Sequence, residues 1–164
     1  MKIPLIAAAL SLAALALPAQ AATRDFFSDL SGQWSGSGKA YLAKMGDVSA
    51  TCKLSVDGAS RTVAMSGNCG LLVFRQALGL KLKSTDGNRV TGTYTGSKTG
   101  PARLSGAVKG QRLNLAVAWN GPVNGDRAAQ MVLTRSGENS FELTVIDKVD
   151  GQTRNTSRFS FRRN

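Results

Sequence analysis

Histidine is absent from this 164-residue chain, and with it the side chain most often used as a general base and as a transition-metal ligand. The only glutamates are Glu138 and Glu142, which lie in an expected turn and on an outward strand face. The chain contains no G-x-S-x-G elbow, no S-x-x-K motif and no phosphate-binding glycine loop before a helix. We therefore expect a protein that is not an enzyme, with no catalytic residue, no metal site and no cofactor.

Asp147 is the one acid whose position suggests a role in the interior. It continues the inward phase of Phe141, Leu143 and Val145. A buried carboxylate needs a charged or hydrogen-bonding partner, and Arg135, in phase with the preceding inward residues, is the candidate. We expect a structural pair first and a ligand contact second.

The first 21 residues have the three regions of a cleaved secretory signal peptide. Lys2 supplies the positive end, residues 3–17 the apolar run, and Ala19-Gln20-Ala21 the small-x-small cleavage site. We expect a mature chain that begins at Ala22 and is soluble in the periplasm or secreted. The alternative is a membrane anchor, for which the apolar run is short.

The mature chain is strongly basic. The signal contains Lys2 and no acid, so the net charge is +10 after cleavage against +11 for the whole chain. Such a charge favours anionic neighbours, such as a membrane surface, acidic glycans or acidic proteins, or simply keeps the domain soluble. Nucleic acid is not an expected partner, because the chain is exported and its basic residues are scattered singly.

Cys52 and Cys69 are the only cysteines, and in an oxidising compartment they should bond to each other. They lie on successive expected strands, so the disulfide would link the two arms of a hairpin whose centre falls between Ser60 and Arg61. We expect a structural role, since a redox site usually has a C-x-x-C pair.

Period-two alternation between turn signals dominates the mature chain and predicts strands joined by hairpins. A short helix is the alternative for residues 71–77, where both faces are apolar. The expected strands cover residues 33–42, 48–56, 62–68, 71–83, 89–96, 102–108, 112–120, 128–135, 140–149 and 153–162.

The alternation assigns one apolar face and one wet, basic face to most strands. The inward residues that we expect to line a ligand site are Leu80, Leu82, Tyr94, Leu115, Val117, Trp119, Phe141 and Leu143. Inward glycines would leave room for a ligand, namely Gly36, Gly38, Gly92 and Gly106.

An antiparallel meander of this length hides its edges most simply by closing on itself. We therefore predict an all-β fold, an up-and-down barrel of eight to ten strands, with a two-sheet sandwich as the alternative. The expected organisation is a signal peptide over residues 1–21, a lead-in segment over 22–30 and one barrel domain over 31–164.

The first expected strand opens with Gly32-Gln33-Trp34, and this G-x-W element resembles that of the calycin barrels, the lipocalin and avidin groups. Residues 90–94 and 117–120 are similar to avidin-like sequences. The resemblance implies that Trp34 lies across one end of a barrel and that a basic side chain from the last strand covers it. Arg163, in phase with Phe159 and Phe161, is the candidate for that cover.

Residues 30–34, together with the cysteine hairpin, are also similar to small periplasmic barrels that inhibit metalloproteases. That resemblance implies a lead-in, here residues 22–29, that enters a protease cleft; the alternative is that Phe26 and Phe27 pack on the barrel.

Two functions remain open. The first is an exported, non-catalytic barrel that binds an apolar or amphipathic ligand, such as an envelope lipid. The second is a protein-interaction module, such as a periplasmic protease inhibitor or an envelope-integrity factor.

Overall fold

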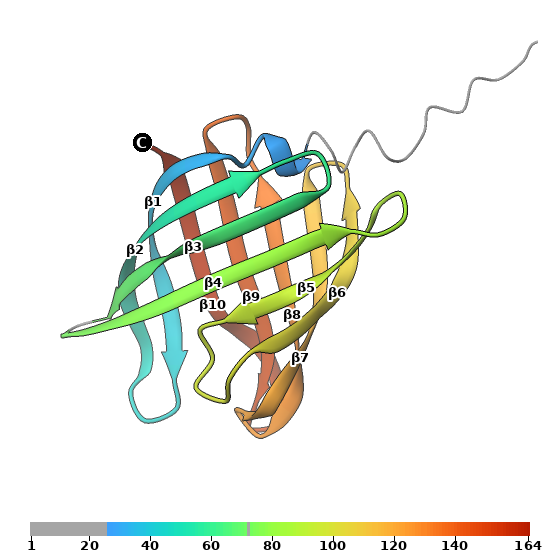
Figure 1. Ribbon diagram of the computed structural model, residues 1–164. Helices are drawn as coiled ribbons and strands as arrows, with labels where there is room; N and C mark the ends of the chain where they lie inside the picture. The colour runs from blue at the N-terminus through green and yellow to red at the C-terminus, as the bar shows by residue number, and fades with distance from the viewer. Residues whose placement is uncertain (1–25, 72) are drawn as a thin grey trace, which may run out of the picture.

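The fold is a closed antiparallel barrel of ten strands, shown by a computed structural model that describes residues 26–71 and 73–164. Each strand pairs with the next along the chain, and the last pairs with the first (Figure 1). The strands are β1 (Gly32–Leu42), β2 (Gly46–Gly58), β3 (Thr62–Leu71), β4 (Phe74–Ser84), β5 (Arg89–Thr95), β6 (Ala102–Lys109), β7 (Arg112–Val123), β8 (Asp126–Arg135), β9 (Ser140–Val149) and β10 (Gln152–Arg163).

This architecture confirms the predicted all-β meander and decides for the barrel over the two-sheet sandwich. Residues 26–28 form a single helical turn, and no helix among the described residues has the length and apolar character needed to cross a membrane. The expected signal peptide, residues 1–21, and residues 22–25 of the lead-in segment lie outside the described residues.

The segment with two apolar faces, residues 71–77, is neither a helix nor one continuous strand, because it contains the turn between β3 and β4. Leu71 belongs to β3, β4 begins at Phe74, and Leu71 pairs with Phe74 across the turn. The expected boundary between these two strands, after Asn68, was therefore three residues too early. The error arose because this turn is apolar in the sequence and has no glycine or asparagine in it or directly beside it.

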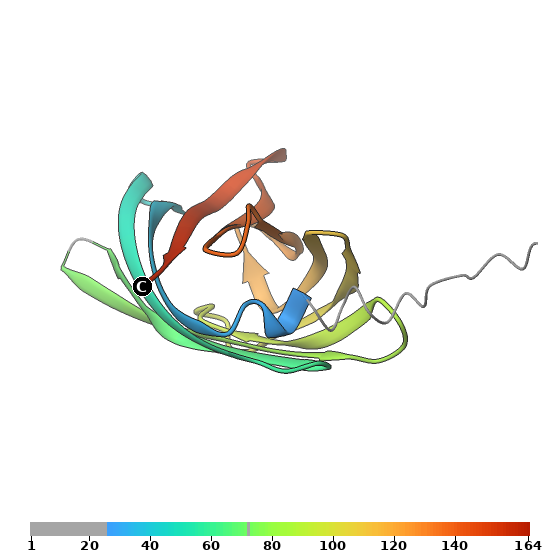
Figure 2. The same ribbon diagram turned by 90° about the horizontal axis from the view of Figure 1, so that it is seen from above.

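One end of the barrel is closed by the lead-in and the first strand. Phe26, Phe27, Leu30 and Trp34 are each at most 1% exposed, and the Trp34 indole Nε1 donates to the Leu30 carbonyl at 2.9 Å. The helical turn and the carboxyl terminus lie at this same end in Figure 1. In the view along the barrel, the turn lies at the end nearest the viewer (Figure 2).

Arg163, the last residue of β10, fastens that end. It pairs with Trp34 in the sheet, and its guanidinium carbon lies 4.3 Å from the centroid of the indole ring. The same guanidinium donates to the carbonyls of Asp29 at 2.7 Å and Glu138 at 3.0 Å, and to that of Ser31. One side chain therefore joins the lead-in, β1 and the turn between β8 and β9. This is the cover that the calycin resemblance implied.

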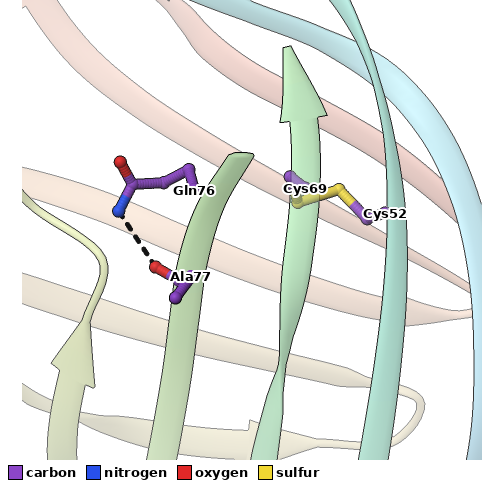
Figure 3. Close-up of a disulfide and its surroundings, with 4 residues drawn as sticks. All are labelled: Cys52, Cys69, Gln76 and Ala77. Carbon is purple, nitrogen blue, oxygen red and sulfur yellow. Dashed lines mark hydrogen bonds between the residues drawn. A yellow bond between two sulfur atoms is a disulfide. The ribbon is translucent and has the colours of Figure 1, made fainter. Parts of the chain in front are cut away.

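The disulfide joins Cys52 and Cys69, which face each other directly across β2 and β3 (Figure 3). The register runs from Cys52 opposite Cys69 to Gly58 opposite Val63, so the hairpin is centred between Ser60 and Arg61, as predicted. Both cysteines are buried and point into the barrel.

The first residues of β4 form a free edge. The pairing of β4 with β3 starts at Phe74, whereas its pairing with β5 starts only at Gly79. β3 and β4 therefore extend past β5, and the views in Figures 1 and 2 show this arm reaching out from the barrel. The Gln76 side chain donates to the carbonyl of Ala77 at 3.0 Å, which satisfies one group of that edge (Figure 3).

The inward glycines do not leave room for a ligand, which corrects the expectation stated for Gly36, Gly38, Gly92 and Gly106. A Cβ atom on Gly38 would lie 2.0 Å from the Arg158 carbonyl oxygen, and one on Gly36 would lie 2.4 Å from the Phe161 ring. Gly92 and Gly106 meet neighbouring backbone carbonyls in the same way. These glycines permit close approach of the adjacent strand.

Candidate functional site

The interior of the barrel is apolar, and all eight residues expected to line a ligand site belong to it. Six of them are buried: Leu80, Leu82, Leu115, Val117, Trp119 and Phe141. Tyr94 and Leu143 are partly exposed and pack against the same core. Alternation therefore identified the inward face, but it could not tell which inward residues border empty space.

A small cavity of about 70 Å³ lies inside the barrel. Of the eight expected residues, only Leu80, Tyr94 and Leu143 line it, whereas the other five pack into the filled part of the core. The lining residues that were not singled out as ligand contacts are Cys52, Leu54, Met65, Cys69, Leu78, Met131, Val145, Ser157, Phe159 and Phe161. Most of these share the inward phase of their strands, the signal by which the sequence could have identified them.

The lining of the cavity is more exposed away from Trp34 than beside it. Along β4 the exposure increases from buried Leu82 and Leu80 to partly exposed Leu78. Along β9 it increases from buried Phe141 to partly exposed Leu143 and Val145, and it decreases again at Asp147 and Val149, which are buried. The partly exposed lining residues, Leu78, Tyr94, Leu143 and Val145, form the mouth of the cavity; they lie on the side away from Trp34, and Asp147 and Val149 remain buried beyond them on β9.

Two polar groups lie beside the cavity: Tyr94 belongs to its lining, and Trp119 packs against Tyr94 outside the lining. The Trp119 side chain is 8% exposed, and its buried indole Nε1 finds no acceptor within the described part of the chain. Its ring lies edge-on to that of Tyr94, with 6.3 Å between centroids. Burial raises the pKa of the Tyr94 phenol, so the phenol is a neutral donor and acceptor at ordinary pH. The site thus offers uncharged hydrogen-bonding groups beside an apolar wall.

Asp147 is buried, but its expected partner was wrong. Its carboxylate accepts from the Asn124 side chain at 3.1 Å and from the Lys148 amide at 2.7 Å. Burial raises the pKa of Asp147, the bonds from Lys148 and Asn124 lower it in part, and the charge of Asp126 raises it further. Arg135 lies at the other end of the barrel, where it pairs with Asp29 at 2.7 Å.

The described part of the lead-in is packed against the barrel. Phe26 and Phe27 are buried, Asp29 is held by Arg135, and the Arg135 guanidinium lies 5.9 Å from the centroid of the Phe26 ring. This arrangement is the packed alternative to a segment that enters a protease cleft.

A second hollow of about 400 Å³ lies on the outer face of β8, β9 and β10. Its lining includes Arg158, which pairs with Glu142 at 2.9 Å, and Thr134, Thr144 and Asn155. The ion pair involves two of the three charged side chains that line this hollow, and the third is Arg112. Among the described residues, no group of three or more His, Cys, Asp or Glu side chains could hold a metal ion.

Comparisons with known proteins identify the fold and no family. No family model matches the chain, and no curated protein sequence matches it. The solved structure of Rv2717c from M. tuberculosis is similar, with a TM-score of 0.67 and 12% identity over 84% of this chain and 94% of that one. A structure of EF1p2_mFAP2b bound to DFHBI has a TM-score of 0.49 and 8% identity, over 88% of this chain and 99% of that one. At such identities the likeness to Rv2717c establishes a shared fold, a small closed β-barrel.

Proposed function

We propose that this chain is an exported, non-catalytic barrel of the calycin type that binds an apolar or amphipathic small molecule, such as an envelope lipid, through the open end of its interior. The observation that carries the proposal is the apolar cavity opposite the end closed by Trp34 and Arg163. A barrel closed at one end and accessible at the other has one entrance for a ligand.

The size of the cavity limits the part of the ligand that enters first. A volume of about 70 Å³ corresponds to roughly two water molecules at liquid density. It therefore accommodates the end of a chain, and a longer ligand displaces the side chains at the mouth. Leu78, Tyr94 and Leu143 are partly exposed there, so they can rearrange without disturbing the closed end.

The polar groups at the mouth favour a ligand that also carries a hydrogen-bond acceptor. A buried donor without an acceptor is unfavourable by about 1–3 kcal/mol, and Trp119 Nε1 is such a donor. An ester, amide or carboxyl oxygen beside Trp119 and Tyr94 would satisfy it. This chemistry is that of an acylated, amphipathic molecule.

The export of the chain, which the first 21 residues predict, is consistent with the disulfide, since such bonds persist in oxidising compartments.

Binding can be tested with N-phenyl-1-naphthylamine, an apolar dye, and with dodecanoate as a competitor. We expect saturable dye fluorescence that dodecanoate reverses, and a change in Trp119 emission that persists in the Trp34→Phe variant. Val145→Phe, which fills the cavity, should weaken dye binding roughly tenfold. Thr93→Phe is the matched control, because Thr93 is exposed on the outer face beside Tyr94. Absence of saturable binding, or equal effects of the two variants, would refute the proposal.

A further inference from the structure

The exposed large apolar side chains of the barrel lie in two turns. Among the described residues, the large hydrophobic side chains that are exposed are Met45, Val73 and Phe74, at 53%, 89% and 70%. Met45 lies in the turn between β1 and β2, and Val73 and Phe74 lie at the turn between β3 and β4. Scattered exposed hydrophobic residues need no explanation, but a group confined to two neighbouring hairpins indicates a contact surface.

Both turns lie at the mouth end of the barrel. In an up-and-down meander, alternate turns share one end, and the closed end carries the lead-in and the carboxyl terminus. The ends of β3 and β4 also reach outward beyond β5 in both ribbon views. We call Met45, Val73 and Phe74, with their neighbours Lys44 and Arg75, the apolar tip.

Cations flank the apolar side chains directly. Lys44 precedes Met45 and Arg75 follows Phe74; both cations are exposed, and neither has an acidic partner in the part of the chain that the structure describes. Aromatic and aliphatic side chains bordered by Lys and Arg favour the interface of a bilayer with anionic headgroups. The overall positive charge of the chain, +11, acts in the same direction.

The inner face of the arm leads from the tip to the cavity. Phe74, Gln76 and Leu78 alternate on the same face of β4 as Leu80, and Leu78 and Leu80 line the cavity. A barrel that rests on a bilayer through this tip would turn the mouth of its cavity toward the lipid.

From these observations we propose that the apolar tip docks the barrel on anionic phospholipid bilayers, with Val73 and Phe74 inserted among the headgroups. Docking does not depend on whether the cavity binds a ligand, and the variants below separate the two properties.

The test is flotation of the purified protein with vesicles of phosphatidylcholine and phosphatidylglycerol in equal parts, and with vesicles of phosphatidylcholine alone. We expect binding to the mixed vesicles that decreases with added salt. The double substitution Val73→Ser/Phe74→Ser should weaken it at least roughly tenfold, and Arg75→Ser should weaken binding to the mixed vesicles only.

Two controls distinguish docking from loss of fold and from ligand binding. The Val73→Ser/Phe74→Ser variant should keep the thermal midpoint and the dye binding of the parent, because both residues are exposed. Addition of Ser60→Phe, which places an exposed ring at the opposite end, should not restore flotation. Val145→Phe should float like the parent even where it no longer binds the dye.

Insertion can be read directly with Phe74→Trp, because Trp34 and Trp119 are both buried. We expect the added emission of this variant to shift to shorter wavelength with mixed vesicles and to be quenched by brominated lipid. Unchanged flotation of the Val73→Ser/Phe74→Ser variant, or an unshifted emission of the Phe74→Trp variant, would overturn the proposal. The proposal would also fail if the parent does not bind vesicles and instead forms a dimer that the Val73→Ser/Phe74→Ser substitution disrupts.

Discussion

Removal of the Arg163 side chain should open the closed end of the barrel. Its guanidinium donates to three carbonyls, on Asp29, Ser31 and Glu138, and covers the Trp34 ring. We therefore predict that Arg163→Ala lowers the free energy of unfolding by several kcal/mol.

The magnitude follows from the separate contacts. Hydrogen bonds from a charged donor contribute about 1.5–3 kcal/mol when shielded and less at the surface, and two of these three are exposed. The cation over the indole adds about 0.5–1 kcal/mol. Together these contacts give roughly 3 kcal/mol, which for a barrel of this size lowers the melting midpoint by about 10 °C.

Urea unfolding followed by tryptophan fluorescence measures this loss, and Arg162→Ala is the matched control. Arg162 is exposed on the opposite face of β10, so its removal should change the unfolding free energy by less than about 0.5 kcal/mol. Arg163→Lys keeps a cation over Trp34 but loses the planar guanidinium and its several donors. Its free energy of unfolding should therefore lie between those of the parent and of Arg163→Ala. If Arg163→Ala is no more destabilising than Arg162→Ala, the described contacts do not hold this end together.

Three further predictions concern stability. Replacement of both Cys52 and Cys69 by Ala should destabilise the barrel by about 3 kcal/mol in the chain-entropy model for a separation of 17 residues; urea unfolding measures this, and a loss below about 1 kcal/mol would contradict it. Because the pKa of Asp147 is raised by burial, its contribution to stability is present below its unfolded pKa of about 3.9 and is lost as the pH rises through the folded value. The free energy of unfolding of Asp147→Asn, minus that of the parent, should therefore be larger at pH 7 than at pH 3. Urea titrations of both proteins at the two pH values measure this, and an equal difference at both would refute the reasoning. Gly38→Ala places a Cβ atom 2.0 Å from a carbonyl oxygen, whereas on Gly70 the nearest atom is 3.8 Å away, so thermal unfolding should show a large loss for the first and little for the second, and equal midpoints would disprove the close approach.

The alternation and the turns predicted the strands except for the boundary between β3 and β4, and the symmetry of the cysteine hairpin predicted its register. The same arithmetic would have corrected the pairing of Asp147 with Arg135. The turn between β8 and β9 places Arg135 opposite Phe141, and Asp147 then lies six residues farther along β9, roughly 20 Å away. The register of a hairpin tells how far apart two inward residues lie along the barrel, whereas a shared inward face alone does not.

The alternation of inward and outward residues could not predict which parts of the interior are filled by side chains. Gly36 and Gly38 suggested open space in the sequence, but in the barrel they face Phe161 and Phe159 across β1 and β10. Which side chain fills the space beside a glycine depends on the neighbouring strand, and these two strands are the farthest apart in the sequence. The apolar turn at residues 71–74 was ambiguous for a related reason, since the type of an apolar residue does not show whether its side chain is exposed or buried.

The seam between β1 and β10 has a consequence for how the barrel is made. Arg163 bonds to Ser31 across a separation of 132 residues, so the ring of hydrogen bonds is completed only when β10 has reached β1. Until then the unpaired edge of β1 could pair with another extended peptide. Pairing of β1 with β10 removes this exposed edge.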